Sequence, residues 1–186
     1  MARALGAALA LAAIAATLAF GDAQSVGSKP AFGQSKGLGR PEALGPRTKS
    51  SGCRQHEALP DRACTPGSIY PGATRSVICV HGYSSRVRNV PASVKDFVYA
   101  EYGIASHSPG EYEVDHLVPL EAGGSNSIAN LFPQPARPAG GAPGFHDKDR
   151  LENAIHKRVC DGRMRLAPAQ RRIARNWVEL LHALGL

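Results

Sequence analysis

The stretch that decides the fold is residues 111–132, which read EYEVDHLVPLEAGGSNSIANLF. Apolar and polar residues alternate from Glu111 to Val118, and this period of two is typical of a β-strand. Pro119 ends the strand, residues 123–126 (GGSN) favour a turn, and a second short strand is expected over 128–132. We therefore predict two β-strands joined by a long connection.

Helices are predicted on both sides of this strand pair. Apolar residues recur at helical spacing over 92–102, 146–160 and 168–184, and a Pro/Gly-rich loop covers 133–144. Residues 53–91 are rich in turns and contain one β-type run, residues 76–80. The sequence thus predicts an α+β fold: a small hairpin-helix core, flanking helices and a disulfide-linked, turn-rich N-terminal part.

The N-terminus has the three parts of an export signal. Met1–Arg3 are positively charged, residues 5–20 form an uncharged apolar run, and residues 21–23 (GDA) are suited to cleavage. An uncleaved membrane anchor is the alternative. Residues 24–50 have the composition of a disordered basic linker. We expect residues 51–186 to form the domain of a secreted or periplasmic protein, with no membrane segment after signal removal.

The cysteines agree with an oxidising compartment. There are four, none in a C-x-x-C pair, so two disulfides with three possible connectivities are expected. A scattered zinc site or free buried thiols are the alternatives. The pairing that we favour joins Cys64 to Cys79 and Cys53 to Cys160.

The charge of the chain favours a polyanionic partner. With 22 Lys and Arg against 15 Asp and Glu, the formal net charge is +7. Nucleic acid or an anionic surface would be attracted to such a protein. The 186 residues leave room for one compact domain, which we expect to be a monomer.

The Asp115-His116 pair carries the candidate chemistry. A neutral imidazole can take the proton of a water that attacks a phosphodiester, and a cation held by a carboxylate can stabilise the developing charge. Neighbouring strand residues point to opposite faces, so both serve one site only if the backbone bends or if they act at different edges. By itself the pair is equally typical of a structural histidine at a strand end.

The wider pattern resembles a known motif. Residues 115–120 (DHLVPL), the Gly-Gly turn and Asn130-Leu131 resemble the HNH endonuclease motif, and downstream residues resemble secreted bacterial members of that ββα-metal superfamily. The resemblance implies a hairpin and a helix that grip one metal ion, with the motif core at about residues 111–160. It implies His116 as general base, Asp115 as metal ligand and Asn130 as the residue that holds the loop and aims the base.

The third motif position departs from the simplest pattern because the Pro/Gly-rich loop delays the helix. The candidate ligands on the helix are His146, Asp149, Asn153 and His156, of which we favour Asn153 and then His146. The last three share a stripe opposite the apolar one, as residues of an ordinary solvated face also do. Mg²⁺ suits oxygen ligands, whereas a histidine ligand favours Mn²⁺, Ni²⁺ or Zn²⁺.

The implied function is a metal-dependent endonuclease that hydrolyses DNA, with RNA as a second substrate, and has little sequence specificity. Phosphate contacts are expected from Arg86, Arg88, Lys148 and Arg150, each of which could instead be a solvated charge. The alternatives are an inactive nucleic-acid or cell-envelope binding module on the same scaffold, and a structural domain with a coincidental Asp-His pair. Whether an inhibitor protein is a further partner is left open by the sequence.

Overall fold

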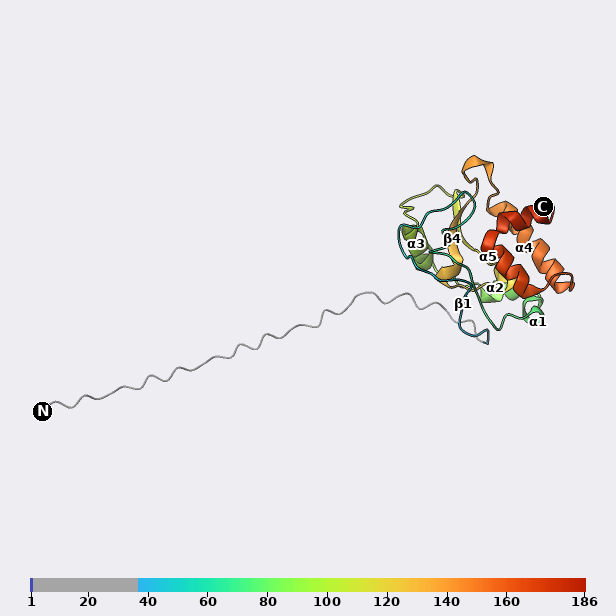
Figure 1. Ribbon diagram of the computed structural model, residues 1–186, viewed down its shortest axis with the longest axis horizontal. Coiled ribbons are helices and arrows are strands. Elements are labelled where there is room, and N and C mark those ends of the chain that lie inside the picture. The colour runs from blue at the N-terminus through green and yellow to red at the C-terminus, as the bar shows by residue number, and fades with distance from the viewer. Residues whose placement is uncertain (2–36) are drawn as a thin grey trace.

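The computed structural model describes Met1 and residues 37–186 (Figure 1). The expected export signal, apart from Met1, and the linker up to residue 36 lie outside the described residues. The described part is mixed α/β, with two small antiparallel sheets, five α-helices and two disulfides. The strands are β1 (Glu42–Ala43), β2 (Ser68–Ile69), β3 (Tyr112–His116) and β4 (Leu131–Pro135). The helices are α1 (Arg75–Ile78), α2 (Tyr83–Val87), α3 (Ala92–Glu101), α4 (Phe145–Cys160) and α5 (Leu166–Ala183).

The β3–β4 pair lies between α3 and α4, which Figure 1 shows on opposite sides of β4. Strand register pairs Asp115 with Phe132 and His116 with Leu131. Since side chains alternate between the faces of a strand, Leu131 packs with the buried valines of α3, and Phe132 joins the larger core that contains Leu151 of α4. The strand pair is therefore covered on both faces: α3 packs on one face, and the main core with α4 packs on the other.

Several predicted elements are confirmed, with small shifts. The helices expected over 92–102, 146–160 and 168–184 are α3, α4 and α5, and the first strand is β3. The second strand begins three residues later than expected, because residues 128–130 form a 3₁₀ turn. The sequence did not predict that β4 extends to Pro135, because prolines such as Pro133 and Pro135 are rare in strands whose N–H groups are all hydrogen-bonded.

The β-type run predicted over 76–80 is wrong. Residues 75–78 form α1, and the N–H groups of Val77 and Ile78 both donate to the Thr74 carbonyl oxygen. Ile78 is fully buried in the main core. A run of β-branched residues this short can take either form, and the burial of Ile78 within this core favours the helix.

Residues 37–50 lie against the domain, which contradicts the expected disordered linker over this part. Leu38 is buried, Leu44 packs against the main core and β1 pairs with β2. Arg47 donates to the Cys64 carbonyl oxygen at 2.9 Å and forms an ion pair with Glu101. Composition alone does not reveal that these few residues have partners 17 and 54 positions away.

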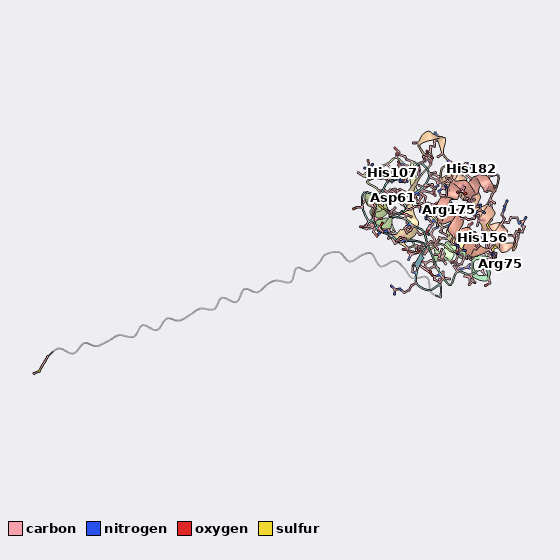
Figure 2. The ribbon with its side chains drawn as sticks, in the orientation of Figure 1. Asp61, Arg75, His107, His156, Arg175 and His182 are labelled. Atoms are coloured by element: carbon pink, nitrogen blue, oxygen red, sulfur yellow. A yellow bond between two sulfur atoms is a disulfide. The ribbon has the colours of Figure 1, made fainter. Side chains whose placement is uncertain are left out.

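The disulfide pairing that we favoured is also wrong. The bonds join Cys53 to Cys64 and Cys79 to Cys160. The end of α1 packs against the end of α4, where Arg75 donates to the Cys160 carbonyl oxygen at 2.6 Å. Figure 2 shows Arg75 and His156 together at this end of the molecule. Two disulfides fit an extracellular or periplasmic protein. Among the described helices, none has the length and apolarity to cross a membrane.

Candidate functional site

His116 ends β3 and is held in one tautomer. Its Nε2 lies 3.0 Å from Oδ1 of Asn126, whose Nδ2 donates to the Val87 carbonyl oxygen at 2.7 Å. Because the amide of Asn126 is thus oriented, Nε2 of His116 carries the proton and donates it. Nδ1 is buried and has no hydrogen-bond partner among the described residues. The free lone pair of the imidazole is therefore on Nδ1.

The electrostatics of His116 keep the ring neutral. The pKa of His116 is lowered to about 4, because burial, helped by the charges of Arg88 and Lys148, outweighs the opposing effects of the Asp115 charge and the Asn126 hydrogen bond. The side chain is 1% exposed. At neutral pH the imidazole is uncharged and able to accept a proton.

Asn130 fixes the connection between the two strands. Its Oδ1 accepts from the backbone N–H groups of Ser68 at 3.1 Å and Val118 at 2.9 Å. Its Nδ2 donates to the carbonyl oxygens of Val118 and Ser125, both at 2.9 Å. The amide is fully buried, and both its oxygen and its nitrogen form hydrogen bonds. Asn130 therefore ties the connection at Val118 and Ser125 to Ser68.

Asp115 belongs to a buried ionic cluster. The Lys148 ammonium donates to Oδ2 of Asp115 at 2.6 Å, to the His116 carbonyl oxygen at 2.7 Å and to the Glu152 carboxylate. The backbone N–H of His116 donates to Oδ1 of Asp115 at 2.7 Å. Both carboxylate oxygens of Asp115 are thus engaged. We call Asp115, Lys148 and Glu152 the lysine cluster.

The two motif side chains do not converge on one point. Asp115 reaches α4 through Lys148, whereas the His116 ring reaches Asn126 in the long connection. This separation follows from strand alternation, which the backbone at the end of β3 does not overcome.

The predicted ligands on α4 are not brought to Asp115. The His146 side chain is 80% exposed and lies 3.8 Å from Asp149, and Asn153 is exposed and donates back to the Asp149 carbonyl oxygen. Nδ1 of His156 lies 2.9 Å from the Glu121 carbonyl oxygen. In the part of the chain that the structure describes, no three His, Cys, Asp or Glu side chains gather as a metal site. The donor set around Asp115 does not fit the expected divalent cation.

The expected phosphate contacts are dispersed. Lys148 is 1% exposed, so its prediction as a surface contact is wrong: the helix turns it toward β3. Arg86 donates to the His81 carbonyl oxygen and Arg150 pairs with Asp147. Arg88 is exposed and close enough to affect the pKa of His116, so it is the exposed member of the four that lies near the candidate base, whereas Lys148 reaches His116 from the buried side.

Sequence reasoning missed Glu152, Asn126 and Gln134. Lys148 and Glu152 are four residues apart beside Leu151 in the apolar stripe of α4, and this spacing could have indicated a buried ion pair. Gln134 lies opposite Glu113 on the strand face that carries Asp115. It is fully buried with both amide atoms unpartnered among the described residues, and no sequence signal indicated this.

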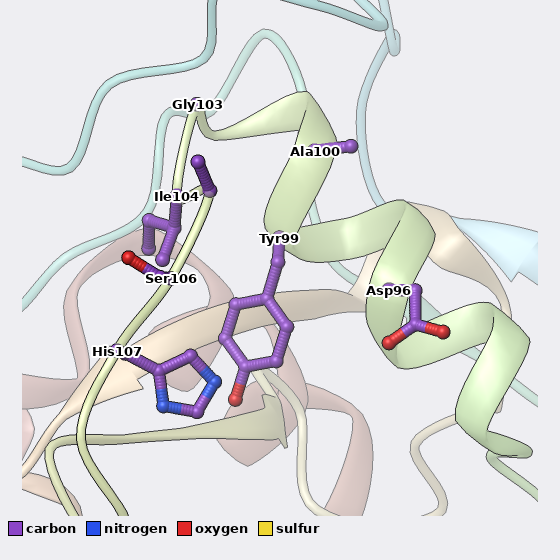
Figure 3. Close-up of a pocket in the computed structure, with 8 residues that line it drawn as sticks. Asp96, Tyr99, Ala100, Gly103, Ile104, Ser106 and His107 are labelled. Atoms are coloured by element: carbon purple, nitrogen blue, oxygen red, sulfur yellow. The ribbon is translucent and has the colours of Figure 1, made fainter.

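A separate open cleft of about 700 Å³ lies beside α3 and is lined by Asp96, Tyr99, Ala100 and residues 103–107. Figure 3 shows the rings of Tyr99 and His107 side by side there, with centroids 4.5 Å apart. Neither Asp115 nor His116 lines this cleft, so it is not part of the candidate site.

No protein-family model, curated protein or solved structure matches the chain. The likeness to HNH endonucleases therefore rests on the motif residues of the sequence alone.

We expect the buried neutral histidine to make stability depend on pH. Because the pKa of His116 is lowered in the folded state, the unfolded chain takes up the proton first as pH falls below about 6.5. The stabilisation from the neutral ring is present above that pH and is lost as pH falls through about 4. Between pH 7 and pH 4 this loss is about 3 kcal/mol.

The measurement is the free energy of unfolding in urea at both pH values. Carboxylates titrate in the same range, so the wild-type protein is compared with a His116→Gln variant, and the difference between the two pH slopes isolates this ring. Equal slopes would show that folding leaves the pKa of His116 unchanged and would contradict a buried neutral ring, and a slope difference of the opposite sign would show that the folded protein holds the ring protonated.

Proposed function

We propose that the chain is an exported nucleic-acid hydrolase that cleaves phosphodiester bonds with His116 as general base. The observation that carries the proposal is the neutral imidazole with its Nδ1 free, held at the end of β3 beside the loop that Asn130 fixes. Two supports accompany it: a helix packs on the strand pair as the motif resemblance implies, and the disulfides fit export.

The reaction uses groups of this chain. The water oxygen forms a bond to phosphorus, the ester P–O bond breaks, and Nδ1 of His116 takes the proton of the water. The leaving oxygen takes a proton from solvent. The exposed Arg88 guanidinium neutralises charge on the phosphoryl oxygens. Because His116 is 1% exposed, the attacking water reaches Nδ1 only when the side chains that cover the ring move apart.

Exposed arginines support a polyanionic partner. Arg171, Arg172 and Arg175 lie on the exposed side of α5, and Arg62 donates to the Arg175 carbonyl oxygen. None of the four forms an ion pair with another described residue, whereas Arg47, Arg150 and Arg163 each pair with a carboxylate. Unpaired guanidinium groups on one helix face suit the phosphates of a nucleic acid without reading its bases.

A metal ion is what the motif resemblance implies, and Mg²⁺ would be the expected one. The chain does not bring His146 and Asn153 to Asp115. The Lys148 ammonium lies beside that carboxylate, where the motif resemblance implies a metal cation. The proposal therefore routes no step through a metal.

The second candidate is a nucleic-acid binding module without activity. The specific observation that favours it is the burial of His116 together with the full engagement of the Asp115 carboxylate. A binder needs basic surface and a stable scaffold but no accessible base.

The discriminating experiment incubates the purified protein with supercoiled plasmid and with single-stranded RNA, in EDTA and in Mg²⁺. Cleavage of either substrate supports the hydrolase. Binding without cleavage, with an affinity that falls steeply with salt, supports the module. Neither binding nor cleavage would reject both.

A further inference from the structure

The lysine cluster is closed on itself. The side chains of Lys148, Asp115 and Glu152 are 1%, 11% and 17% exposed, so the charges lie out of bulk solvent. An ammonium has three donors, and those of Lys148 go to Asp115, Glu152 and the His116 carbonyl oxygen. No donor of Lys148 is left for a substrate.

The cluster also opposes the binding of a divalent cation by Asp115. One carboxylate oxygen accepts from Lys148 and the other from the His116 N–H. A divalent cation on the remaining lone pairs of these oxygens would be repelled by the adjacent ammonium, or would have to expel it and leave it buried without its partner. Expelling one member of a buried ion pair is strongly unfavourable.

The protonation states agree with a permanent cation. Burial alone would lower the pKa of Lys148, but the Asp115 and Glu152 carboxylates outweigh it and raise that pKa. Burial raises the pKa of Glu152 to about 8 despite the lysine, and the Asp115 charge adds to this effect. Near neutral pH the cluster therefore carries about one positive charge, on Lys148, and one negative charge, on Asp115, while Glu152 is largely protonated.

We infer that Lys148 is a built-in cation at the place where the motif resemblance expects a metal, so that Asp115 binds no divalent cation. Lys148 holds Asp115 and the backbone of His116 together and ties α4 to β3. It acts on His116 as a positioning residue. One consequence rests on the proposed function: cleavage proceeds undiminished in EDTA.

The test is equilibrium dialysis against Mn²⁺, combined with thermal unfolding in Mn²⁺ and in EDTA. The wild-type protein is expected to bind no more Mn²⁺ than its Asp115→Asn variant and to unfold at the same temperature in both buffers. One bound Mn²⁺ per chain that is lost in Asp115→Asn but kept in Asp96→Asn, an exposed carboxylate of α3, would overturn the inference.

Two variants extend the test to Lys148. Lys148→Ala frees the Asp115 and Glu152 carboxylates, and it is expected to gain Mn²⁺ binding and a melting temperature that Mn²⁺ raises. Lys148→Met removes a positive charge near His116, so the pKa of that ring, followed by NMR, is expected to rise. If both variants are unfolded, the wild-type dialysis still decides. An unchanged His116 pKa in folded Lys148→Met would reject the positioning role.

These results are separable from the proposed function. A protein that binds no Mn²⁺ and cleaves nothing would keep the inference and reject the hydrolase. A protein that cleaves only when Mn²⁺ is bound at Asp115 would keep the hydrolase and overturn the inference.

Discussion

An Asn130→Ala variant is expected to lose about 5 kcal/mol of unfolding free energy, because the four backbone groups that its amide serves would each be left buried and unpaired. A domain of this size is stable by roughly 5–15 kcal/mol, so the variant should be largely unfolded or close to it at 37 °C. Urea denaturation followed by circular dichroism measures the loss.

Asn153→Ala is the matched control. That asparagine is exposed and donates only within its own helix, so its loss is expected to stay within about 0.5 kcal/mol. A small effect at Asn130, or equal effects at both asparagines, would contradict the role given to the Asn130 amide in fixing the long connection.

Removing the Cys79–Cys160 disulfide is expected to lower the unfolding free energy by about 4.5 kcal/mol. The bond closes a loop of 81 residues, and chain entropy makes long loops the most stabilising to close. Cys53–Cys64 closes only 11 residues, and its removal should cost about 3 kcal/mol by the same argument. Paired Cys→Ala variants, measured in urea, give both values.

The pairing itself is checked by peptide mapping without reduction. The expected disulfide-linked peptides join Cys53 to Cys64 and Cys79 to Cys160. A Cys64–Cys79 peptide would contradict this structure, and a larger loss for the shorter loop would contradict the entropic explanation of the stabilisation.

Local periodicity predicted most of the secondary structure. The apolar stripes of α3, α4 and α5 and the alternation of β3 are properties of short windows, and all four elements lie close to where they were expected. The errors arose where contacts between residues far apart in the sequence determine the local structure. The position of Ile78 in the core makes α1 a helix, and the packing of α1 on α4 pairs Cys79 with Cys160 across 81 residues.

The candidate site was predictable in part for the same reason. His116 and Asn130 are placed by the β3–β4 pair and its connection, which lie close together in the sequence, within residues 112–135. Which α4 side chains face Asp115 depends instead on how the helix is rotated against the sheet. The structure turns Lys148 inward and Asn153 outward, and only the place of Lys148 in the apolar stripe indicated this.

The central claim is that the neutral, buried His116 makes this chain a phosphodiester hydrolase. The most direct measurement is the rate at which supercoiled plasmid is nicked in EDTA by the wild-type protein, by His116→Gln and by His182→Gln, an exposed histidine control. Circular dichroism and thermal unfolding confirm that all three are folded. We predict nicking by the wild-type protein and the control, and a loss of about a hundredfold or more in His116→Gln. Equal rates for folded His116→Gln and wild-type protein, or no nicking by any of the three even when the assay is repeated with Mn²⁺ in place of EDTA, would contradict the claim.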